Sequence, residues 1–442
     1  MTVGARQVVT SSVLLLVENM VRLMAVAAVS FFIARQLGPE QFGILNFASA
    51  LMAILLSIAT LGLDTPVIFR LMHSQHPSAV MRAVLVLRCA AGLAVLVLAT
   101  LAAYLLKHND SLALSVTLIV SLSIPLSTFS VFDYWFKAKT LPTRPAMARI
   151  TGTLIAAGAK VACLLFGFGV VALAWTVVLE ALVTSVGMTL AYLSVTRKIG
   201  NDGWSEGRQL IIVIARESWP YMLSAVAVVA YMKIDVVMLG YLSTNSETGI
   251  YGLAQKLSEV LYIVPVVIIE SAYPVLARRF MDRGQSLGSQ QGQMLFDLAA
   301  GGSMIATIIS LILARPAIHL MFGAGYENAI NIFYLHAWSC VAIALNTARH
   351  RWLATLGLQR YAPSVTGIGL IINVAMNFVL IPQFGALGAA LATVVSYFIS
   401  GYISSFFFVA LRDIANMQTK ALWPWARLYF HGRTWRISAN PG

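Results

Sequence analysis

Five basic side chains stand inside stretches that are otherwise apolar enough to cross a bilayer: Arg22, Arg88, Lys160, Lys233 and Lys256. A cation at bilayer depth costs roughly 2.5–3.5 kcal/mol on insertion scales, so such residues usually face a protein interior or a water-filled cavity. Arginine grips phosphate oxygens through its planar fork, and lysine attracts them as a point charge. We therefore predict that these five residues bind an anionic substrate.

For three of these cations, the sequence allows different alternatives to substrate binding. Arg22 has Glu18 one turn earlier, and at this spacing the two side chains could form a buried ion pair that fixes helix packing. Arg88 lies only a few residues inside its span, where snorkelling to the cytoplasmic surface is the simpler account. Lys160 is deep in its span with no acid on the same turn, which makes it the strongest single candidate.

The other two cations are close to carboxylates in the sequence. Lys233 and Asp235 are two residues apart and do not face each other on a helix, so one could pair elsewhere while the other lines a cavity. Lys256 and Glu259 are three apart and could neutralise each other, which is the slightly favoured reading.

Four intramembrane carboxylates are candidates for coupling or gating: Glu18, Glu180, Asp235 and Glu270. Glu180 stands alone in its span and could titrate as a proton-coupling group, although pairing with a cation of the first half is the simpler role. Glu270 follows Pro265, which removes a backbone hydrogen bond, so it could gate the inner mouth at a hinge or serve as an interface carboxylate.

These residues require helices that cross a membrane. The chain of 442 residues is 59% hydrophobic and only 11% charged, whereas soluble domains carry about 25% charged residues. About 20 apolar residues cross a bilayer as a helix. On that basis the sequence predicts an all-α protein with twelve transmembrane helices, at residues 13–34, 42–63, 83–106, 112–132, 150–166, 170–194, 219–241, 249–272, 295–313, 329–345, 362–381 and 386–410.

Basic residues set the predicted orientation. With the N-terminus in the cytoplasm, most of the 30 Lys and Arg residues fall in cytoplasmic segments, and Arg35, Lys107 and Arg315 fall on the opposite face. This asymmetry is the positive-inside pattern, and it places both termini in the cytoplasm. The net charge of +13 therefore reflects topology and needs no nucleic-acid partner.

Four short matches recur in the same order in the two halves, such as Phe168-Gly169 before Thr176-Val177-Val178 and Phe384-Gly385 before Thr393-Val394-Val395. Small residues recur in any helical membrane protein, but four ordered matches at a nearly constant offset indicate duplication. We predict two parallel six-helix lobes related by a pseudo-two-fold axis along the membrane normal. The predicted parts are lobe 1–196, a cytoplasmic linker 197–218 with a short in-plane helix at 210–214, lobe 219–411, and a basic aromatic cytoplasmic tail 412–442.

Three segments resemble a known family. They are the hairpin Ala34-Arg35-Gln36-Leu37-Gly38-Pro39-Glu40-Gln41-Phe42-Gly43, the run Lys233-Ile234-Asp235-Val236-Val237-Met238-Leu239-Gly240 followed by Thr248-Gly249-Ile250-Tyr251, and Asn377-Phe378-Val379-Leu380-Ile381-Pro382-Gln383-Phe384-Gly385-Ala386-Leu387-Gly388-Ala389-Ala390. The chain resembles polysaccharide-repeat (O-antigen type) flippases of the polysaccharide transporter family, within the multidrug/oligosaccharidyl-lipid/polysaccharide exporter superfamily.

The resemblance implies a multi-pass protein of the bacterial inner membrane that acts in lipopolysaccharide or related polysaccharide biosynthesis. Such a transporter moves an undecaprenyl-diphosphate-linked oligosaccharide from the cytoplasmic to the periplasmic leaflet by alternating access, with membrane lipids around it. A polysaccharide polymerase and chain-length machinery are partners to test. Proton or sodium coupling, membrane potential and downhill removal of product all remain open as energy sources, as do the sugar and the oligomeric state.

Four rival functions predict different sequence features. A lipid II flippase of the same superfamily is expected to carry two further C-terminal helices and an arginine-rich first-helix motif, whereas here the tail after Leu411 is polar and basic. An ion-coupled multidrug antiporter would favour carboxylates over isolated cations. A polymerase or ligase would need a longer outer loop than residues 314–328, and a scaffold for glycan-assembly enzymes would not need Lys160.

Cofactor chemistry is not expected from the sequence. The chain contains no Gly-x-x-x-x-Gly-Lys loop and no His-Glu-x-x-His motif, so we expect neither ATP hydrolysis nor a zinc-protease site. His73 and His76 lie beside Pro77 without an evident third ligand, so a metal site is not predicted. We predict a transporter without a cofactor, and not an enzyme.

Overall fold

The computed structural model describes the backbone of residues 3–196, 207–283 and 290–423. Side chains are described from Val29 onward within these ranges, except at 207–208, 283 and 324. Every regular element in this part of the chain is helical, as the sequence predicts. Ten of the helical segments found there are long and apolar enough to cross a membrane. The chain is therefore an all-α, multi-pass membrane protein.

Two of these ten segments contain a break at a glycine. In α1 (Val3–Ala59) Gly38 has φ 72° and ψ 175°, and in α14 (Ala362–Gly401) Gly385 has φ 54° and ψ −130°. Positive φ is strained for residues with a Cβ, so glycine is the residue that allows each break. Pro39 follows the first break, where a helix start tolerates the missing N–H. Each of these two helices is thus a pair of helical segments joined at a sharp bend.

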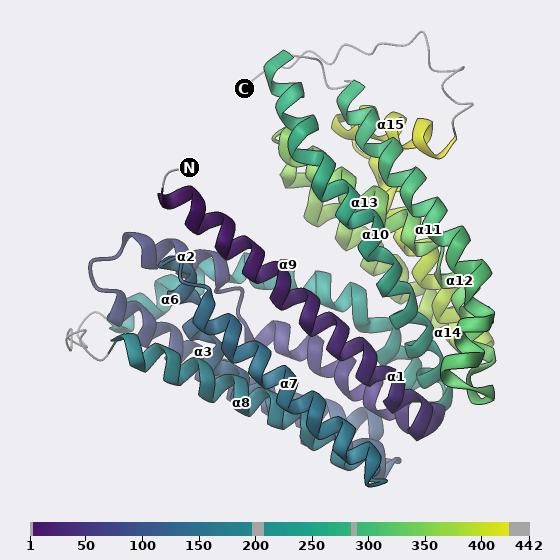
Figure 1. The fold of residues 1–442 in the computed structure, drawn as a ribbon, viewed down its shortest axis with the longest axis horizontal. Coiled ribbons are helices and arrows are strands. Elements are labelled where there is room, and N and C mark those ends of the chain that lie inside the picture. Colours follow the sequence, from purple (N-terminus) through teal and green to yellow (C-terminus); the bar gives the residue numbers. More distant parts are fainter. Residues whose placement is uncertain (1–2, 197–206, 284–289, 424–442) are drawn as a thin grey trace. The chain divides into compact units, whose positions relative to one another are not determined.

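The chain divides into two compact units, residues 1–249 and 250–442, called here the N-terminal unit and the C-terminal unit. The N-terminal unit is drawn in purple to teal in Figure 1. After α1 it contains α2 (Asp64–His73), α3 (Pro77–Lys107), α4 (Ser111–Ser121), α5 (Ser123–Ser127), the 3-10 turn η1 (Thr128–Val131), α6 (Phe132–Ala138), α7 (Thr143–Leu165), α8 (Val170–Thr196) and α9 (Gly207–Leu242).

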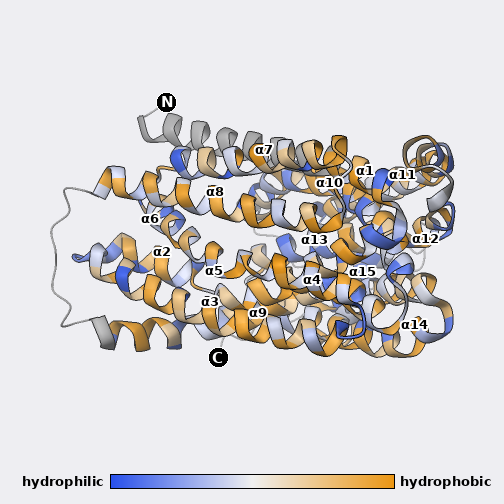
Figure 2. Cartoon of the chain, turned by 90° about the horizontal axis from the view of Figure 1, so that it is seen from below, coloured by the Kyte–Doolittle hydropathy of each residue, from blue (hydrophilic) through white to orange (hydrophobic). Residues whose placement is uncertain are grey.

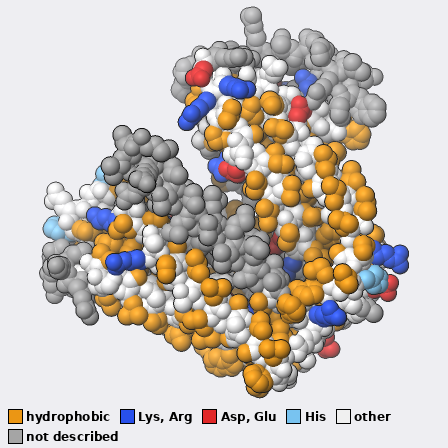
Figure 3. Space-filling model, in the orientation of Figure 1, with side chains coloured by type: hydrophobic (Ala, Val, Ile, Leu, Met, Phe, Trp, Pro, Cys, Tyr) orange, Lys and Arg blue, Asp and Glu red, His pale blue; other side chains and the backbone are white. Residues whose placement is uncertain are grey.

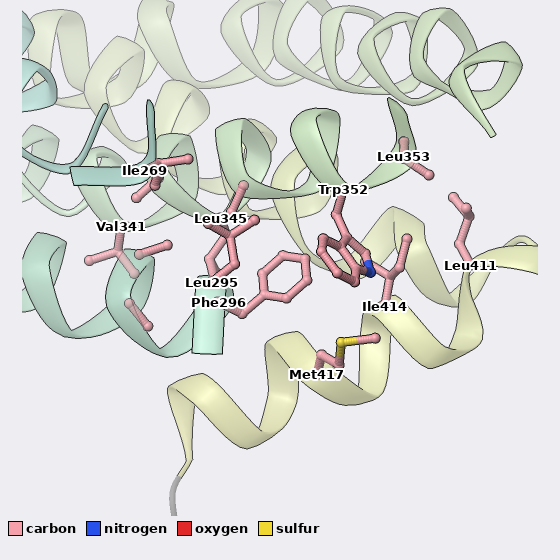
Figure 4. Packing of buried hydrophobic residues seen from close by; sticks show 14 of the residues in the cluster. Ile269, Leu295, Phe296, Val341, Leu345, Trp352, Leu353, Leu411, Ile414 and Met417 are labelled. Carbon is pink, nitrogen blue, oxygen red and sulfur yellow. The ribbon is translucent and has the colours of Figure 1, made fainter. Parts of the chain in front are cut away.

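The C-terminal unit contains most of α10 (Asn245–Arg283), whose first turn belongs to the N-terminal unit. It continues with α11 (Gln290–Phe322), η3 (Ala324–Tyr326), α12 (Asn328–His336), α13 (Ser339–Thr355), η4 (Gln359–Tyr361), α14, η5 (Ile403–Phe406), η6 (Val409–Leu411) and α15 (Arg412–Leu422). Its core is an apolar cluster in which Trp352, Phe296, Ile414 and Met417 pack together (Figure 4). This cluster fixes the rotation of α13, which matters for the site below.

One local expectation was wrong. Residues 210–214 are not a separate in-plane helix, because α9 runs without a break from Gly207 to Leu242. The segment that was predicted as a basic aromatic cytoplasmic tail begins with α15, which buries Ile414 and Gln418. Residues 424–442 lie outside the described part of the chain. The predicted boundary at 197–218 differs from the compact units, which place α9 with the first unit, and the lobe division stays a prediction.

Apolar side chains cover the lengths of the long helices. Figure 2 shows hydrophobic residues along the helices of both units, and Figure 3 shows a largely hydrophobic face with charged side chains in small separate groups. Large apolar residues such as Leu93, Val97 and Leu165 are exposed, which a bilayer would cover. The charged residues that remain within the spans are therefore the exceptions that need an explanation.

Candidate functional site

A polar cluster joins α7 and α8 in the N-terminal unit. The ammonium of Lys160 donates to Glu180 Oε2 at 3.4 Å, and Thr153 Oγ1 donates to Glu180 Oε1 at 3.0 Å. The side chains of Lys160 and Glu180 are 19% and 30% exposed, so both are partly desolvated. Glu180 therefore pairs with a cation of the first half, as expected from the sequence.

Small residues bring these two helices close enough for the cluster. A Cβ at Gly152 would overlap the hydroxyl of Thr184, and a Cβ at Gly187 would contact Ala148 at 3.0 Å. Helices with small residues at their contact approach closely in membranes. In Figure 1 α7 and α8 run side by side, so that Lys160 and Glu180 face each other across the contact.

The depth of Lys160 follows from its place in the helix. It lies five residues before Leu165, the last residue of α7, which is about 8 Å at 1.5 Å per residue. Lys160 therefore lies closer to the end of α7 at Leu165 than to its beginning at Thr143.

Arg88 does not snorkel, and that expectation was wrong. Its side chain is 2% exposed, and Nη1 donates to the carbonyl oxygen of Ala59 at 2.6 Å. Nη2 donates to the carbonyl oxygen of Ser127 at 3.2 Å and to Ser130 Oγ at 3.0 Å. These acceptors lie where α1 ends and where α5 passes into η1, because helix ends leave carbonyl groups without intrahelical partners. In this conformation Arg88 holds three elements together and is closed to a ligand.

The remaining predicted site residues are only partly resolved by the structure. Asp235 is fully buried on α9 and Lys233 is half-buried two residues before it. Lys256 and Glu259 are both half-buried on α10. The side chains of Glu18 and Arg22 lie outside the described residues, although their backbone is helical. A substrate-binding or gating role for these residues stays a prediction.

Glu270 pairs with a residue that the sequence analysis did not single out. Arg351, on α13, donates from Nε to Glu270 Oε1 at 2.7 Å, and its Nη2 forms an ion pair with the same oxygen at 2.7 Å. The Arg351 guanidinium also lies 6.0 Å from the ring centre of Tyr273, and Thr355 Oγ1 donates to the Tyr273 hydroxyl at 3.1 Å. The signal available in the sequence was the run Arg349-His350-Arg351 just after a predicted span, which the predicted topology alone explains.

A second polar group lies nearer the N-terminal ends of the same two helices. Tyr262 of α10 and Ser339 of α13 share a hydrogen bond of 2.6 Å between their hydroxyls. His336, at the end of α12, is 1% exposed and lies beside both, with 3.5 Å from Nδ1 to each hydroxyl oxygen. The contact between α10 and α13 is therefore polar at two places. One contains the hydroxyls of Tyr262 and Ser339, and the other contains the ion pair of Glu270 and Arg351.

The N-terminal unit also contains a tight junction where the turn between α3 and α4 meets the turn between α9 and α10. Lys107, 8% exposed, donates to the carbonyl oxygen of Gly240 at 2.6 Å and to Asn245 Oδ1 at 2.9 Å. Asn245 Nδ2 donates to Asp110 Oδ2 at 2.6 Å. We call Lys107, Asp110 and Asn245 the outer clasp, since the predicted topology places all three on the side opposite the cytoplasm.

Glycines let the backbones meet at this junction. A Cβ at Gly43 would overlap the carbonyl oxygen of Asn245, and a Cβ at Gly249 would overlap that of Pro39. Burial acts to raise the pKa of Asp110, but hydrogen bonds from Ala113 N and Asn245 and the charge of Lys107 outweigh it and lower the pKa. Asp110 is therefore ionised at neutral pH and holds the clasp as a charged acceptor.

Comparison with known proteins places this architecture. A family model described as "Polysaccharide biosynthesis protein" matches residues 8–280. The chain is 22% identical over 385 residues to "Probable low-salt glycan biosynthesis flippase Agl15" of Haloferax volcanii, covering 85% of this chain and 79% of that protein. It is 24% identical to "Probable flippase AglR" of the same organism, where the match covers 54% of this chain and only about half, 49%, of the relative.

Solved structures show the same fold at lower identity. "Lipid II flippase MurJ, inward closed conformation" matches with a TM-score of 0.66 and 12% identity, covering 97% of this chain and 94% of that one. An inward-facing multidrug resistance MATE family transporter of the MOP superfamily matches with a TM-score of 0.66 and 15% identity, covering 92% and 99%. The family model covers more than half of the chain, and the chain therefore belongs to the polysaccharide biosynthesis protein family and has the fold of the MOP superfamily.

Proposed function

We propose that this transporter moves a polyprenyl-diphosphate-linked oligosaccharide from the cytoplasmic leaflet to the opposite leaflet. Unaided transfer would desolvate the diphosphate charge, which carries an idealised penalty on the order of tens of kcal/mol. Cations inside the protein would replace water around the diphosphate, while the prenyl tail stays in lipid. An O-antigen or related surface polysaccharide repeat in a bacterial inner membrane, with both chain termini cytoplasmic, is the narrower form of this proposal.

The observation that carries the proposal is the pair formed by Lys160 and Glu180. Charge-assisted N–H···O bonds are typically about 2.7–2.9 Å, so the separation of 3.4 Å leaves the ammonium loosely held. Glu180 also accepts from Thr153, which keeps the carboxylate in place when the lysine moves. Lys160 can therefore turn to a phosphate oxygen without leaving Glu180 with no partner.

Transport by alternating access also needs two lobes that move against each other. Counting the segments on either side of Gly38 and Gly385 separately raises the ten candidate spans to twelve, which agrees with the proposed duplication. In that division α9 begins the second lobe, so the outer clasp joins the first lobe to the second. We propose that the clasp holds the outer side closed until the substrate binds.

The experiment that tests the function is leaflet transfer in proteoliposomes. The purified full chain is reconstituted with a fluorescent polyprenyl-diphosphate oligosaccharide, and the fraction that reaches the opposite leaflet is measured by a membrane-impermeant quencher. Lys160→Ala should abolish transfer, whereas Lys139→Ala should not, because Lys139 is exposed in the cytoplasmic loop between α6 and α7. Both variants must reconstitute to the wild-type level.

One result would reject the proposed function, and a second would reject only the role of Lys160. Wild-type protein that transfers no lipid-linked oligosaccharide but exports a cationic drug would favour the multidrug antiporter, which the shared fold also allows. Transfer that survives Lys160→Ala at the wild-type rate would remove Lys160 from the substrate path.

A further inference from the structure

Arg351 is placed where a diphosphate would first meet the protein. It lies four residues before Thr355, the last residue of α13, in a span that runs from Asn328 to Thr355. At 1.5 Å per residue it is about 6 Å from the helix end, which is the depth of the cytoplasmic headgroups under the predicted topology. A lipid-linked diphosphate rests at this depth before any transfer begins.

The Arg351 side chain is held ready for an anion by its helix and its neighbours. Trp352, the next residue, is fully buried in the core of the C-terminal unit, so α13 cannot rotate freely. The Arg351 side chain is 48% exposed and faces Glu270 and Tyr273 of α10. Thr355 donates its hydroxyl proton to the Tyr273 hydroxyl at 3.1 Å on the same contact, so the Tyr273 proton can be donated to a phosphate oxygen.

Glu270 fills the anion position in the observed conformation. Both Nε and Nη2 of Arg351 lie 2.7 Å from the same carboxylate oxygen, and Nε donates a hydrogen bond to it. The guanidinium edge formed by Nε and Nη2 is one that arginine also uses to bind phosphate oxygens. The Glu270 side chain is 40% exposed, and an ion pair that is open to water contributes little to stability. A diphosphate, which carries more charge and more acceptor oxygens than a carboxylate, would displace it.

We propose that Arg351, Tyr273 and Thr355 form a docking site for the diphosphate of a lipid in the cytoplasmic leaflet, and that Glu270 occupies this site as an internal anion until the lipid arrives. The proposal rests on the proposed function, since it names where that substrate first binds. A second polar group, formed by Tyr262, His336 and Ser339, lies on the same helices. Tyr262 is eight residues before Glu270 on α10, which is about 12 Å along the helix. The ligand would therefore find further hydrogen-bonding groups on the same pair of helices.

The test measures binding of undecaprenyl diphosphate to the full chain in nanodiscs. Glu270→Gln should tighten binding about two- to fivefold, the range expected when a half-exposed competing ion pair is removed. Arg351→Gln should weaken binding at least about tenfold. Arg351→Lys keeps the pair with Glu270 but loses the fork, so it should bind with intermediate affinity and serves as the second variant if Arg351→Gln does not fold. The matched control is Arg360→Gln, because Arg360 is also exposed and lies 5.1 Å from the ring centre of Tyr361.

Each outcome decides the proposal. Weaker or unchanged binding in Glu270→Gln would mean that the pair only joins α10 to α13, and it would overturn the docking site. Unchanged binding in Arg351→Gln, or an equal loss in Arg360→Gln, would do the same. Inorganic pyrophosphate should compete only weakly, and equal affinity for the free anion would overturn docking from the lipid leaflet.

Failure of this inference and failure of the proposed function can be told apart. Leaflet transfer that requires Lys160, together with unchanged diphosphate affinity in Glu270→Gln, would reject the docking site and leave the transporter function standing. Absent transfer in wild-type protein, together with the expected changes in diphosphate affinity, would reject the function and keep the binding site.

Discussion

Replacing Arg88 with methionine separates a structural role from a substrate-binding role. The guanidinium is buried and donates three hydrogen bonds, to Ala59, Ser127 and Ser130. A hydrogen bond that involves a charged group contributes about 1.5 kcal/mol or more, so the three together contribute about 4–5 kcal/mol. Methionine fills much of the volume and avoids the cost of burying a charge, which offsets part of this loss. We expect a net loss of about 3 kcal/mol in the free energy of unfolding.

The assay is thermal and denaturant unfolding of the purified variant in detergent, together with binding of undecaprenyl diphosphate. Arg88→Met should unfold at a clearly lower temperature, and the fraction that stays folded should bind the lipid with wild-type affinity. Arg88→Lys should recover only part of the stability, because an ammonium cannot reach three acceptors in two directions. Wild-type stability combined with lost lipid binding would refute the structural role and return Arg88 to the substrate site.

Three further changes have distinct expected outcomes. Gly249→Ala should destabilise the protein by about 2 kcal/mol or more, because a Cβ would overlap the backbone of Pro39. The control Gly158→Ala has open space around it and should be neutral or gain a few tenths of a kcal/mol in stability. The melting temperatures of the two variants test this prediction. Trp352→Ala should lower the free energy of unfolding by about 3–5 kcal/mol through the cavity it leaves in the C-terminal core, measured by denaturant unfolding. Asp110→Asn should lower the melting temperature at pH 7, and the difference from wild type should shrink as the pH falls below about 3.9. The pKa of Asp110 is depressed in the folded protein, so its contribution is full above the unfolded value and is lost as pH falls through the lower folded value. A difference that does not shrink with falling pH would contradict this.

The sequence was most informative about helices and least informative about the partners of its charges. The spans could be predicted because a bilayer demands about 20 apolar residues per crossing, a signal that is local in the chain. Span length also predicted that the chain turns between residues 34 and 42, where the structure has the break at Gly38. The continuity of α9 could not be predicted, because the polar segment before Trp219 resembles a linker in composition. In the structure this segment is part of α9 from Gly207 onward.

The candidate site divides in the same way. Lys160 and Glu180 could each be singled out, because a lone charge in an apolar span is rare. That Glu180 accepts from Lys160 depends on the close approach of α7 and α8 at Gly152, which is a property of packing. Arg351 could not be recognised, since a basic residue near the cytoplasmic end of a span is what the positive-inside rule already expects.

The sequence by itself determined that this is an all-helical membrane protein with charges retained inside its spans, because hydrophobicity and its interruptions are properties of consecutive residues. Only the tertiary structure decided that Arg88 is enclosed by helix ends, that Glu270 holds Arg351, and that Lys107 closes the outer clasp. These partners are 29, 81 and 133 residues apart, and helix packing brings them together in ways that no local pattern specifies.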